Sequence, residues 1–159
     1  IQVNVQNITL KDRQSTTKVK VTGLAKGDYI KSWKSSNTKI VKVNSKGKIT
    51  AQNRAGNATV TVTLGSGKKA VIKVKVQKTA VKTTKLTLPK TATVKVKKTL
   101  TLKPVLTPVT SSEKITYTTS NKKIATVNKN GVVTGKKKGT AVITAKSGSK
   151  TAKIKITVR

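Results

Sequence analysis

Apolar and polar residues alternate along both halves of the chain. The segments AVIKVKV, from Ala70, and AKIKITV, from Ala152, place lysines and Val or Ile residues at alternate positions. Successive side chains of a strand point to opposite faces, so each segment has one apolar face and one hydrated face. Two such apolar faces packed together form the core of a β-sandwich.

Short strands separated by turn residues are predicted in each half. Turn signals recur about every 8–12 residues, which is the spacing typical of sandwiches and barrels. Val, Ile and Thr dominate, aromatic content is only 2%, and no helix is indicated. In the second half we predict strands over residues 85–88, 94–103, 114–119, 123–127, 132–134, 140–146 and 151–158.

Turns that contain glycine connect these predicted strands. Asn130-Gly131 predicts a type I′ turn, in which both central residues have positive φ, and Lys46-Gly47 fills the same place in the first half. The sequences GSG at 65–67 and SGS at 147–149 predict the hairpins between the last two strands of each half.

The same segment occurs twice in the chain. SNTKIVKVNSKGKITAQNRAGNATVTV begins at Ser36 and SNKKIATVNKNGVVTGKKKGTAVITA at Ser120. Ser and Asn favour turns by bonding to their own backbone, so we interpret the repeated Ser-Asn pair as turn chemistry rather than a recognition motif. Upstream of the repeated segment, we align ITL at residues 8–10 with LTL at 86–88.

The boundary between the halves is predicted in KTAVKTT, residues 78–84, which lies between a last strand and a first strand. This predicts two domains, residues 1–79 and 80–159. A connection this short, without Gly or Pro, favours modules joined end to end over a freely jointed pair.

The chain is strongly cationic. It carries 36 Lys and Arg residues against Asp12, Asp28 and Glu113, for a net charge of +33. The first predicted domain has 17 basic and two acidic residues, and the second has 19 and one. Only three of the basic residues are arginines. Lysine is a hydrated point charge rather than a planar fork, so we expect general attraction to polyanions and no sequence-specific recognition of nucleic acid.

Composition also excludes several kinds of chemistry. Without Cys there can be no disulfide, thiolate metal site or cysteine nucleophile, and without His the commonest general base is missing. Paired carboxylates and phosphate-binding loops are also missing, so we predict no catalytic activity, no cofactor and no metal site. No apolar run approaches the ~18 residues of a membrane span.

The densest basic loop is GKKKG, residues 135–139. Lys122 and Lys123 can approach it across the sheet edge, which makes Lys122, Lys123, Lys136, Lys137 and Lys138 a candidate polyanion contact. The alternatives are a solvated loop and a contact for teichoic acid, acidic glycan, nucleic acid or anionic lipid, because clustered lysines attract polyanions through counterion release. The first half has QNRAG in this place, so the fold does not require the cluster.

The predicted core includes both aromatic residues that precede Ser-Asn. Trp33 and Tyr117 occupy corresponding positions on a strand where a sandwich buries an aromatic side chain. The alternative is an exposed sugar-stacking platform, which needs further aromatic residues, and only Tyr29 is available. The full set of predicted core residues is Trp33, Tyr117, Val43, Val127, Ile49 and Val133.

An intramolecular isopeptide bond between a lysine and an asparagine is a further hypothesis for a surface module. It needs a buried carboxyl neighbour, and only Asp12, Asp28 and Glu113 can serve. Carboxylates are rarely buried, so we expect no such bond. A mass lower by one ammonia would reveal it.

Residues 85–158 resemble a bacterial immunoglobulin-like domain of group 2. The hallmark of that family is an aromatic residue, Ser-Ser-Asn, an apolar IA-x-V, Asn-x-x-Gly and then Gly-x-Ala-x-Ile-x-Ala, which matches YTTSNKKIATVNKNGVVTGKKKGTAVITA from Tyr117 closely. The first half is similar but looser. The resemblance implies an all-β fold of two tandem immunoglobulin-like β-sandwich domains joined end to end. Both halves lack the Gly-acidic pair that the family often places before its second strand.

The resemblance also implies a biological setting. Such domains occur as tandem repeats in bacterial surface proteins, including invasin- and intimin-like adhesins, and as accessory modules of cell-wall enzymes. We therefore expect a non-catalytic spacer in a longer extracellular protein, at the surface or in the wall of a Gram-positive cell. Its expected partners are neighbouring domains of the same chain and anionic wall polymers or acidic glycans, with the module itself monomeric. The alternative is a specific adhesin or carbohydrate-binding module.

Overall fold

The computed structural model describes residues 1–159, which divide into two compact units, Ile1–Val81 and Lys82–Arg159. All regular structure is β-strand. No helix long and apolar enough to cross a membrane is present. The predicted boundary between residues 79 and 80 lies in the strand-free segment that separates the last strand of unit 1 from the first strand of unit 2.

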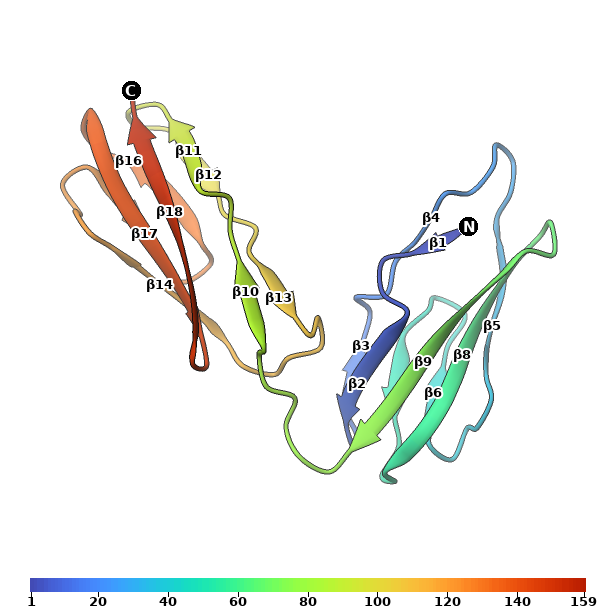
Figure 1. The fold of residues 1–159 in the computed structure, drawn as a ribbon. Helices are drawn as coiled ribbons and strands as arrows, with labels where there is room; N and C mark the ends of the chain where they lie inside the picture. Colours follow the sequence, from blue (N-terminus) through green and yellow to red (C-terminus); the bar gives the residue numbers. More distant parts are fainter. The chain divides into compact units, whose positions relative to one another are not determined.

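Unit 1 has a four-stranded sheet opposite a three-stranded sheet (Figure 1). In the four-stranded sheet, β2 runs parallel to β9 and the other pairs are antiparallel. A separate short pair completes the unit. The four-stranded order is β2(Asn7–Lys11), β9(Lys69–Gln77), β8(Gly56–Leu64) and β5(Ile30–Ser35); the three-stranded order is β3(Ser15–Thr16), β7(Ile49–Ala51) and β6(Val41–Val43); the short pair is β1(Gln2–Val3) and β4(Val21–Thr22).

Unit 2 repeats the nine strands of unit 1 in the same order and with the same pairing. This arrangement confirms the predicted fold class, an all-β chain of immunoglobulin-like sandwiches. The four-stranded order is β11(Thr91–Val94), β18(Lys150–Val158), β17(Gly139–Ser147) and β14(Ile115–Thr119); the three-stranded order is β12(Thr99–Thr101), β16(Val132–Gly135) and β15(Ala125–Val127); the short pair is β10(Lys85–Thr87) and β13(Val105–Thr107).

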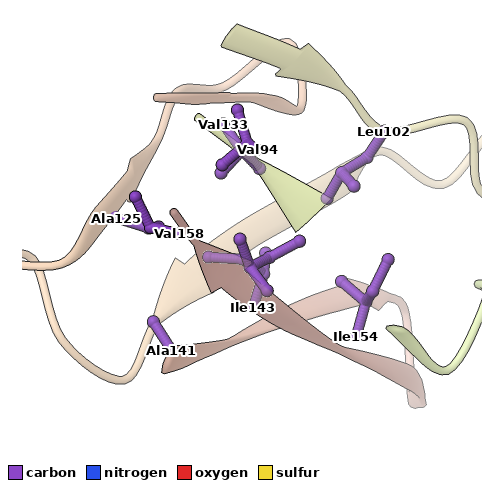
Figure 2. Packing of buried hydrophobic residues seen from close by; sticks show 9 residues of the cluster. Val94, Leu102, Ala125, Val133, Ala141, Ile143, Ile154 and Val158 are labelled. Carbon is purple, nitrogen blue, oxygen red and sulfur yellow. The ribbon is translucent and has the colours of Figure 1, made fainter. Parts of the chain in front are cut away.

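The alternating pattern produces a separate apolar interior in each unit. On β9, Ile72 and Val74 are buried while Lys73 and Lys75 are exposed. In unit 2, buried side chains from both sheets meet in one cluster, which includes Ile143 of the four-stranded sheet (Figure 2). Full burial of such a side chain contributes about 1.5–3 kcal/mol, so these interiors are the main source of stability.

The predicted core residues fall into two groups. Ile49 and Val133 are fully buried. Val43 and Val127, which were also predicted as core residues, are only half-buried, and Val127 packs against the buried cluster of unit 2. Each is the last residue of an edge strand, β6 or β15, where cover from the opposite sheet ends. Trp33 and Tyr117 are also half-buried and are described with the candidate site.

The predicted strand over residues 94–103 is wrong. The chain forms β11 and β12 there, separated by a turn at residues 95–98, and the following strand β13 was not predicted. Lys97 has a φ of 65° in this turn, as Arg13 has a φ of 67° in the matching turn of unit 1. The turn at residues 95–98 contains no Gly, Pro, Asn, Asp or Ser, so the sequence carried no ordinary turn signal there.

The alignment of residues 8–10 with 86–88 is also wrong. Ile8 pairs with Val74 of β9, and the residue that pairs with the matching position of β18 is Ala92. Strand β2 therefore corresponds to β11, whereas Leu86 lies on β10, the counterpart of β1. The similarity of ITL and LTL misled the alignment because Thr alternates with apolar residues in many strands of this chain.

Asn-x-x-Gly closes the turn between the last two strands of each three-stranded sheet, but not as a type I′ turn. Gly131 has a φ of 76° and Gly47 a φ of 79°, whereas Asn130 does not have positive φ. The side-chain oxygen of Asn128 accepts hydrogen bonds from the N–H groups of Asn130 and Val132, at 2.9 and 3.0 Å. The asparagine thus folds its own backbone, and only the glycine adopts the left-handed conformation.

Candidate polyanion-binding surface

Every basic side chain of the chain is exposed. All 36 Lys and Arg residues are exposed at the surface. This follows from the strand pattern, because lysines occupy the positions that point away from the two interiors, and from loops that are rich in lysine. The surface of each unit is therefore strongly cationic.

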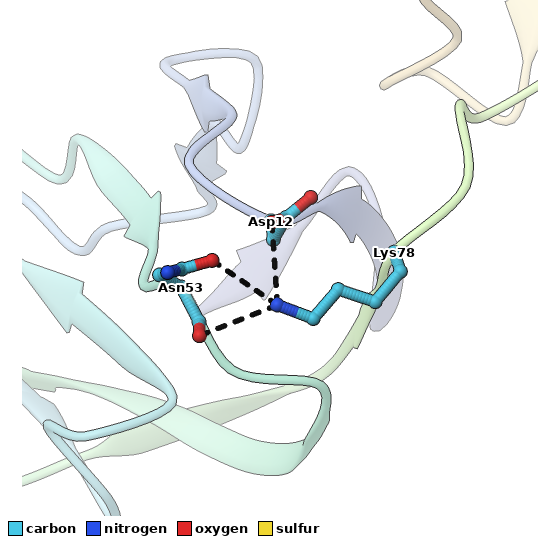
Figure 3. Close-up of polar contacts among 3 residues, drawn as sticks. All are labelled: Asp12, Asn53 and Lys78. Atoms are coloured by element: carbon cyan, nitrogen blue, oxygen red, sulfur yellow. Dashed lines mark hydrogen bonds and ion pairs between the residues drawn. The ribbon is translucent and has the colours of Figure 1, made fainter.

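Asp12 makes the one salt bridge of the chain. Its Oδ2 lies 3.4 Å from Nζ of Lys78, and the same ammonium donates to Oδ1 of Asn53 at 3.1 Å (Figure 3). This is the lysine, asparagine and carboxylate combination that an isopeptide bond requires. However, the Lys78 side chain is 55% exposed, and its ammonium contacts Asp12 and Asn53 through an ion pair and a hydrogen bond. The ion pair joins Asp12 to Lys78, the residue that directly follows β9.

Asp28 holds the hairpin between β8 and β9. Its Oδ2 accepts the hydroxyl of Ser66 at 2.6 Å, and its Oδ1 accepts the N–H groups of Tyr29 and Ser66. The Ser66 hydroxyl is the main cause that lowers the pKa of Asp28 below its ordinary value. This carboxylate therefore stays charged but is occupied by neutral donors.

Glu113, the only acidic residue of unit 2, has an equally structural role. Its Oε2 accepts the N–H of Thr83 at 2.8 Å. The Thr83 hydroxyl lies 2.7 Å from the hydroxyls of Ser111 and Ser147, which forms a buried polar cluster. All three carboxylates of the chain have structural partners, and three negative charges offset little of the charge on 36 exposed basic residues.

The structure brings together the five lysines of the candidate contact. The N–H groups of Lys136 and Lys137 both donate to the carbonyl of Ile124, at 2.7 and 3.3 Å, and Ile124 directly follows Lys122 and Lys123. All five lysines are exposed, so the contact region is open to a ligand.

Sequence reasoning missed four basic residues beside this cluster. They are Lys95, Lys97, Lys98 and Arg159, in segments joined by hydrogen bonds to Gly135 or to β11. The predicted long strand 94–103 spread the first three along an element instead of placing them at a turn. If the parallel pairing of β11 with β18 had been predicted, Lys95 and Arg159 would have been placed at the same end of the sheet.

Trp33 and Tyr117 each lie over a turn glycine. A Cβ built on Gly47 would be 2.7 Å from Cζ2 of Trp33, and one built on Gly131 would be 2.9 Å from the Tyr117 ring. Both rings, which were predicted to belong to the core, are half-buried, and Tyr117 packs against the buried cluster of unit 2. Burial raises the pKa of the Tyr117 phenol. The two rings are only half-buried because they lie on β5 and β14, the edge strands of the four-stranded sheets.

A shallow hollow of about 500 Å³ lies beside Trp33. Lys34, Ser35, Thr38 and Lys42 contribute polar groups to it. The Ser35 hydroxyl is already hydrogen-bonded to the carbonyl of Val41, at 2.7 Å. No group of three His, Cys, Asp or Glu residues in the chain could hold a metal ion.

The nine-strand sandwich with its half-buried aromatic residue over a turn defines an immunoglobulin-like module. The family profile of the bacterial Ig-like domain (group 2) matches residues 75–158, just over half of the chain. The chain belongs to this family. No curated protein matches the sequence significantly.

Several solved structures resemble the chain. Domains 5–6 of the S-layer protein SbsC share 19% identity, with 99% of this chain and 95% of that one covered and a TM-score of 0.49. A longer crystal structure of the S-layer protein shares 24% identity over 89% of this chain, with a TM-score of 0.45, and the chain spans 21% of its length. A C-terminal fragment of intimin, bound to the intimin-binding domain of its translocated receptor, shares 19% identity over 87% of this chain and 55% of that one, with a TM-score of 0.40.

Proposed function

We propose that the chain is a non-catalytic structural module of a bacterial surface protein, which its cationic exterior holds against anionic polymers of the cell wall. The observation that carries the proposal is the exposure of all 36 basic residues together with the structural engagement of all three carboxylates. The family of the chain, bacterial Ig-like domain (group 2), supports the structural part of the role.

Charge of this kind acts over short distances and without shape recognition. At physiological salt the Debye length is about 8 Å, so only polyanions close to the surface are attracted strongly. A wall polymer with regularly spaced phosphates provides many such contacts and releases counterions as it binds. The Gram-positive wall, with its teichoic acid, is the environment that fits this chemistry.

The salt dependence of wall binding tests the proposal. We expect the chain to sediment with purified wall fragments at about 50 mM salt and to lose about 10³-fold or more in affinity by about 200 mM, as expected for several phosphate contacts. A chain whose lysines have been acetylated is the control, because acetylation removes the charge. Binding that persists at high salt, or that survives acetylation, would contradict the proposal.

A second candidate function rests on the half-exposed Trp33 and the hollow beside it. A sugar ring stacked on this indole would make the chain a glycan-binding module. Retention of one defined glycan at high salt, with a change in Trp33 fluorescence, would favour this alternative, since the chain has no other tryptophan.

A further inference from the structure

Gly135, at the end of β16, lies between two lysine-rich segments of unit 2. Its N–H donates to the carbonyl of Lys98 at 3.0 Å, and its carbonyl accepts the N–H of Lys97 at 2.8 Å. A Cβ on this residue would lie 2.7 Å from the carbonyl oxygen of Lys95, so the turn at 95–98 packs directly on Gly135. The next residue in the chain is Lys136, the first of the three consecutive lysines.

Two more segments reach the same end of the unit. The turn that carries Lys122 and Lys123 is tied to residues 136–137 through the carbonyl of Ile124. Arg159 donates its N–H to the carbonyl of Val94 at 3.0 Å, and its carbonyl accepts the N–H of Val96 at 2.8 Å. We call residues 95–98, 122–123, 136–138 and 159 the basic end of unit 2. It contains nine basic residues, all exposed, and no acidic side chain.

The only acidic residue of unit 2 lies at the other end of its sheet. Gly139, next to Lys138, begins β17, and Ser147, whose hydroxyl lies 3.3 Å from the carbonyl of Glu113, ends it. These nine residues span about 25–30 Å at roughly 3.3 Å per residue. That distance exceeds the Debye length of about 8 Å several times, so Glu113 does not offset the charge of the basic end.

Unit 1 has the same backbone arrangement but a different charge. Ala51 donates to the carbonyl of Gln14 at 2.8 Å, Gln52 to that of Ile40 at 2.8 Å, and Asp12 to that of Gln77 at 2.8 Å, which reproduces the bonds of the basic end. The matching segments of unit 1, residues 11–14, 38–39, 52–55 and 77, hold four basic residues and one acidic residue. The fold therefore does not require the nine cations of unit 2.

We propose that the basic end of unit 2 is a binding site for a linear polyol-phosphate polymer. This inference rests on the proposed function and locates it on one part of the surface. Eight of the nine cations are lysines, which bind phosphates as point charges and do not select planar or base-specific groups. Their attachment to four hydrogen-bonded segments holds them in one region, so a flexible chain of phosphates can contact several at once.

A nucleic acid fits this surface less well than a polyol phosphate. Proteins that bind single strands without sequence preference combine a cationic groove with aromatic side chains on which the bases stack. The basic end contains no aromatic residue, and the ring of Tyr117 lies over Gly131, at the opposite end of β16. The basic end therefore offers contacts to phosphates but no stacking contact to a base.

Unit 1 supplies the substitutions that test the site. Lys98, Lys136 and Arg159 correspond to Gln14, Gln52 and Gln77, so the variant K98Q/K136Q/R159Q places in unit 2 the residues that unit 1 already uses in the same backbone arrangement. The control variant K146Q/K150Q/K153Q removes equal charge from exposed lysines near the β17–β18 hairpin. Both are compared with the unaltered chain for binding to synthetic poly(glycerol phosphate) and to a thymidine oligonucleotide with the same number of phosphates.

We expect the first variant to bind poly(glycerol phosphate) about tenfold or more weakly and to lower the slope of log affinity against log salt by about 2, while the control changes both by much less. Equal losses of affinity in the two variants would contradict the location of the site at the basic end and leave the proposed function intact. Tighter binding of the oligonucleotide than of poly(glycerol phosphate) would overturn the assignment of the polymer. Absence of binding to wall fragments by the unaltered chain would instead contradict the proposed function. Unchanged unfolding midpoints of both variants establish that the fold is retained.

Discussion

Replacing Ile72 by alanine is expected to lower the free energy of unfolding of unit 1 by about 2–5 kcal/mol. Ile72 is fully buried on β9, opposite Val60 of β8. Removal of its larger side chain loses apolar burial and leaves a cavity that the surrounding β-branched side chains cannot fill without strain. Trp33 is the only tryptophan, so its fluorescence during urea denaturation reports the unfolding of unit 1.

The neighbouring residue provides the matched control. Val71 is next to Ile72 on the same strand, but it points outward and is 49% exposed. We expect Val71→Ala to change the free energy of unfolding by less than about 0.5 kcal/mol. Similar losses in the two variants would mean that the two faces of β9 do not differ in burial, and that the alternating pattern has been misread.

Replacing Gly47 by alanine is expected to destabilise unit 1 by about 3 kcal/mol. Two effects add. The φ of 79° is a left-handed conformation that costs an L-residue roughly 1–2 kcal/mol. The new methyl group would also collide with the Trp33 ring, 2.7 Å away, so the indole must leave its place over the turn at a cost of about 1–3 kcal/mol. Urea denaturation measures the loss, and a shift of the native Trp33 emission toward longer wavelength reports the displaced ring.

Gly67 separates these two effects. It has a φ of 85°, but a Cβ built on it would meet nothing within 4 Å. Gly67→Ala should therefore show only the conformational cost, about 1–2 kcal/mol, and leave the native fluorescence unchanged. If Gly47→Ala were no more harmful than Gly67→Ala, the ring would not be packed on the turn as described.

The alternating pattern was sufficient to predict the fold class because lysines alternate with Val or Ile residues along the last strand of each unit. Residues 69–77 and 150–158 illustrate this clearly, and both form nine-residue strands. The hairpins at 65–67 and 147–149 were also predicted correctly, because Gly and Ser mark them. Ser36-Asn37 and Ser120-Asn121 form turns as predicted, with Asn37 and Asn121 each accepting a backbone N–H two residues later.

The pattern could not predict features that depend on backbone conformation or on pairing between distant strands. Lys97 and Arg13 adopt positive φ without any residue type that signals it, so one long strand was predicted where a turn occurs. The parallel pairing of β2 with β9 and of β11 with β18 leaves no mark in either strand. Half-burial of Trp33 and Tyr117 depends on their position at a sheet edge, which follows from topology rather than from local sequence.

The candidate site was predicted only in part for the same reason. Lys136, Lys137 and Lys138 are consecutive in the sequence and were found at once, together with Lys122 and Lys123. Lys98 and Arg159 lie far apart in the chain and come to this end of the unit only through the β11–β18 pairing and the turn on Gly135. A charge cluster built from several segments becomes visible only when the topology is known.

Amine labelling of the native chain, read residue by residue by mass spectrometry, tests most directly the claim that all lysines lie outside two apolar interiors. We expect every lysine to react at nearly the rate measured in the urea-unfolded chain, because each is exposed. Lys78 is included, since its amine is an exposed ion-pair partner of Asp12 and not part of an amide with Asn53. A set of lysines that reacts only after unfolding would contradict the account.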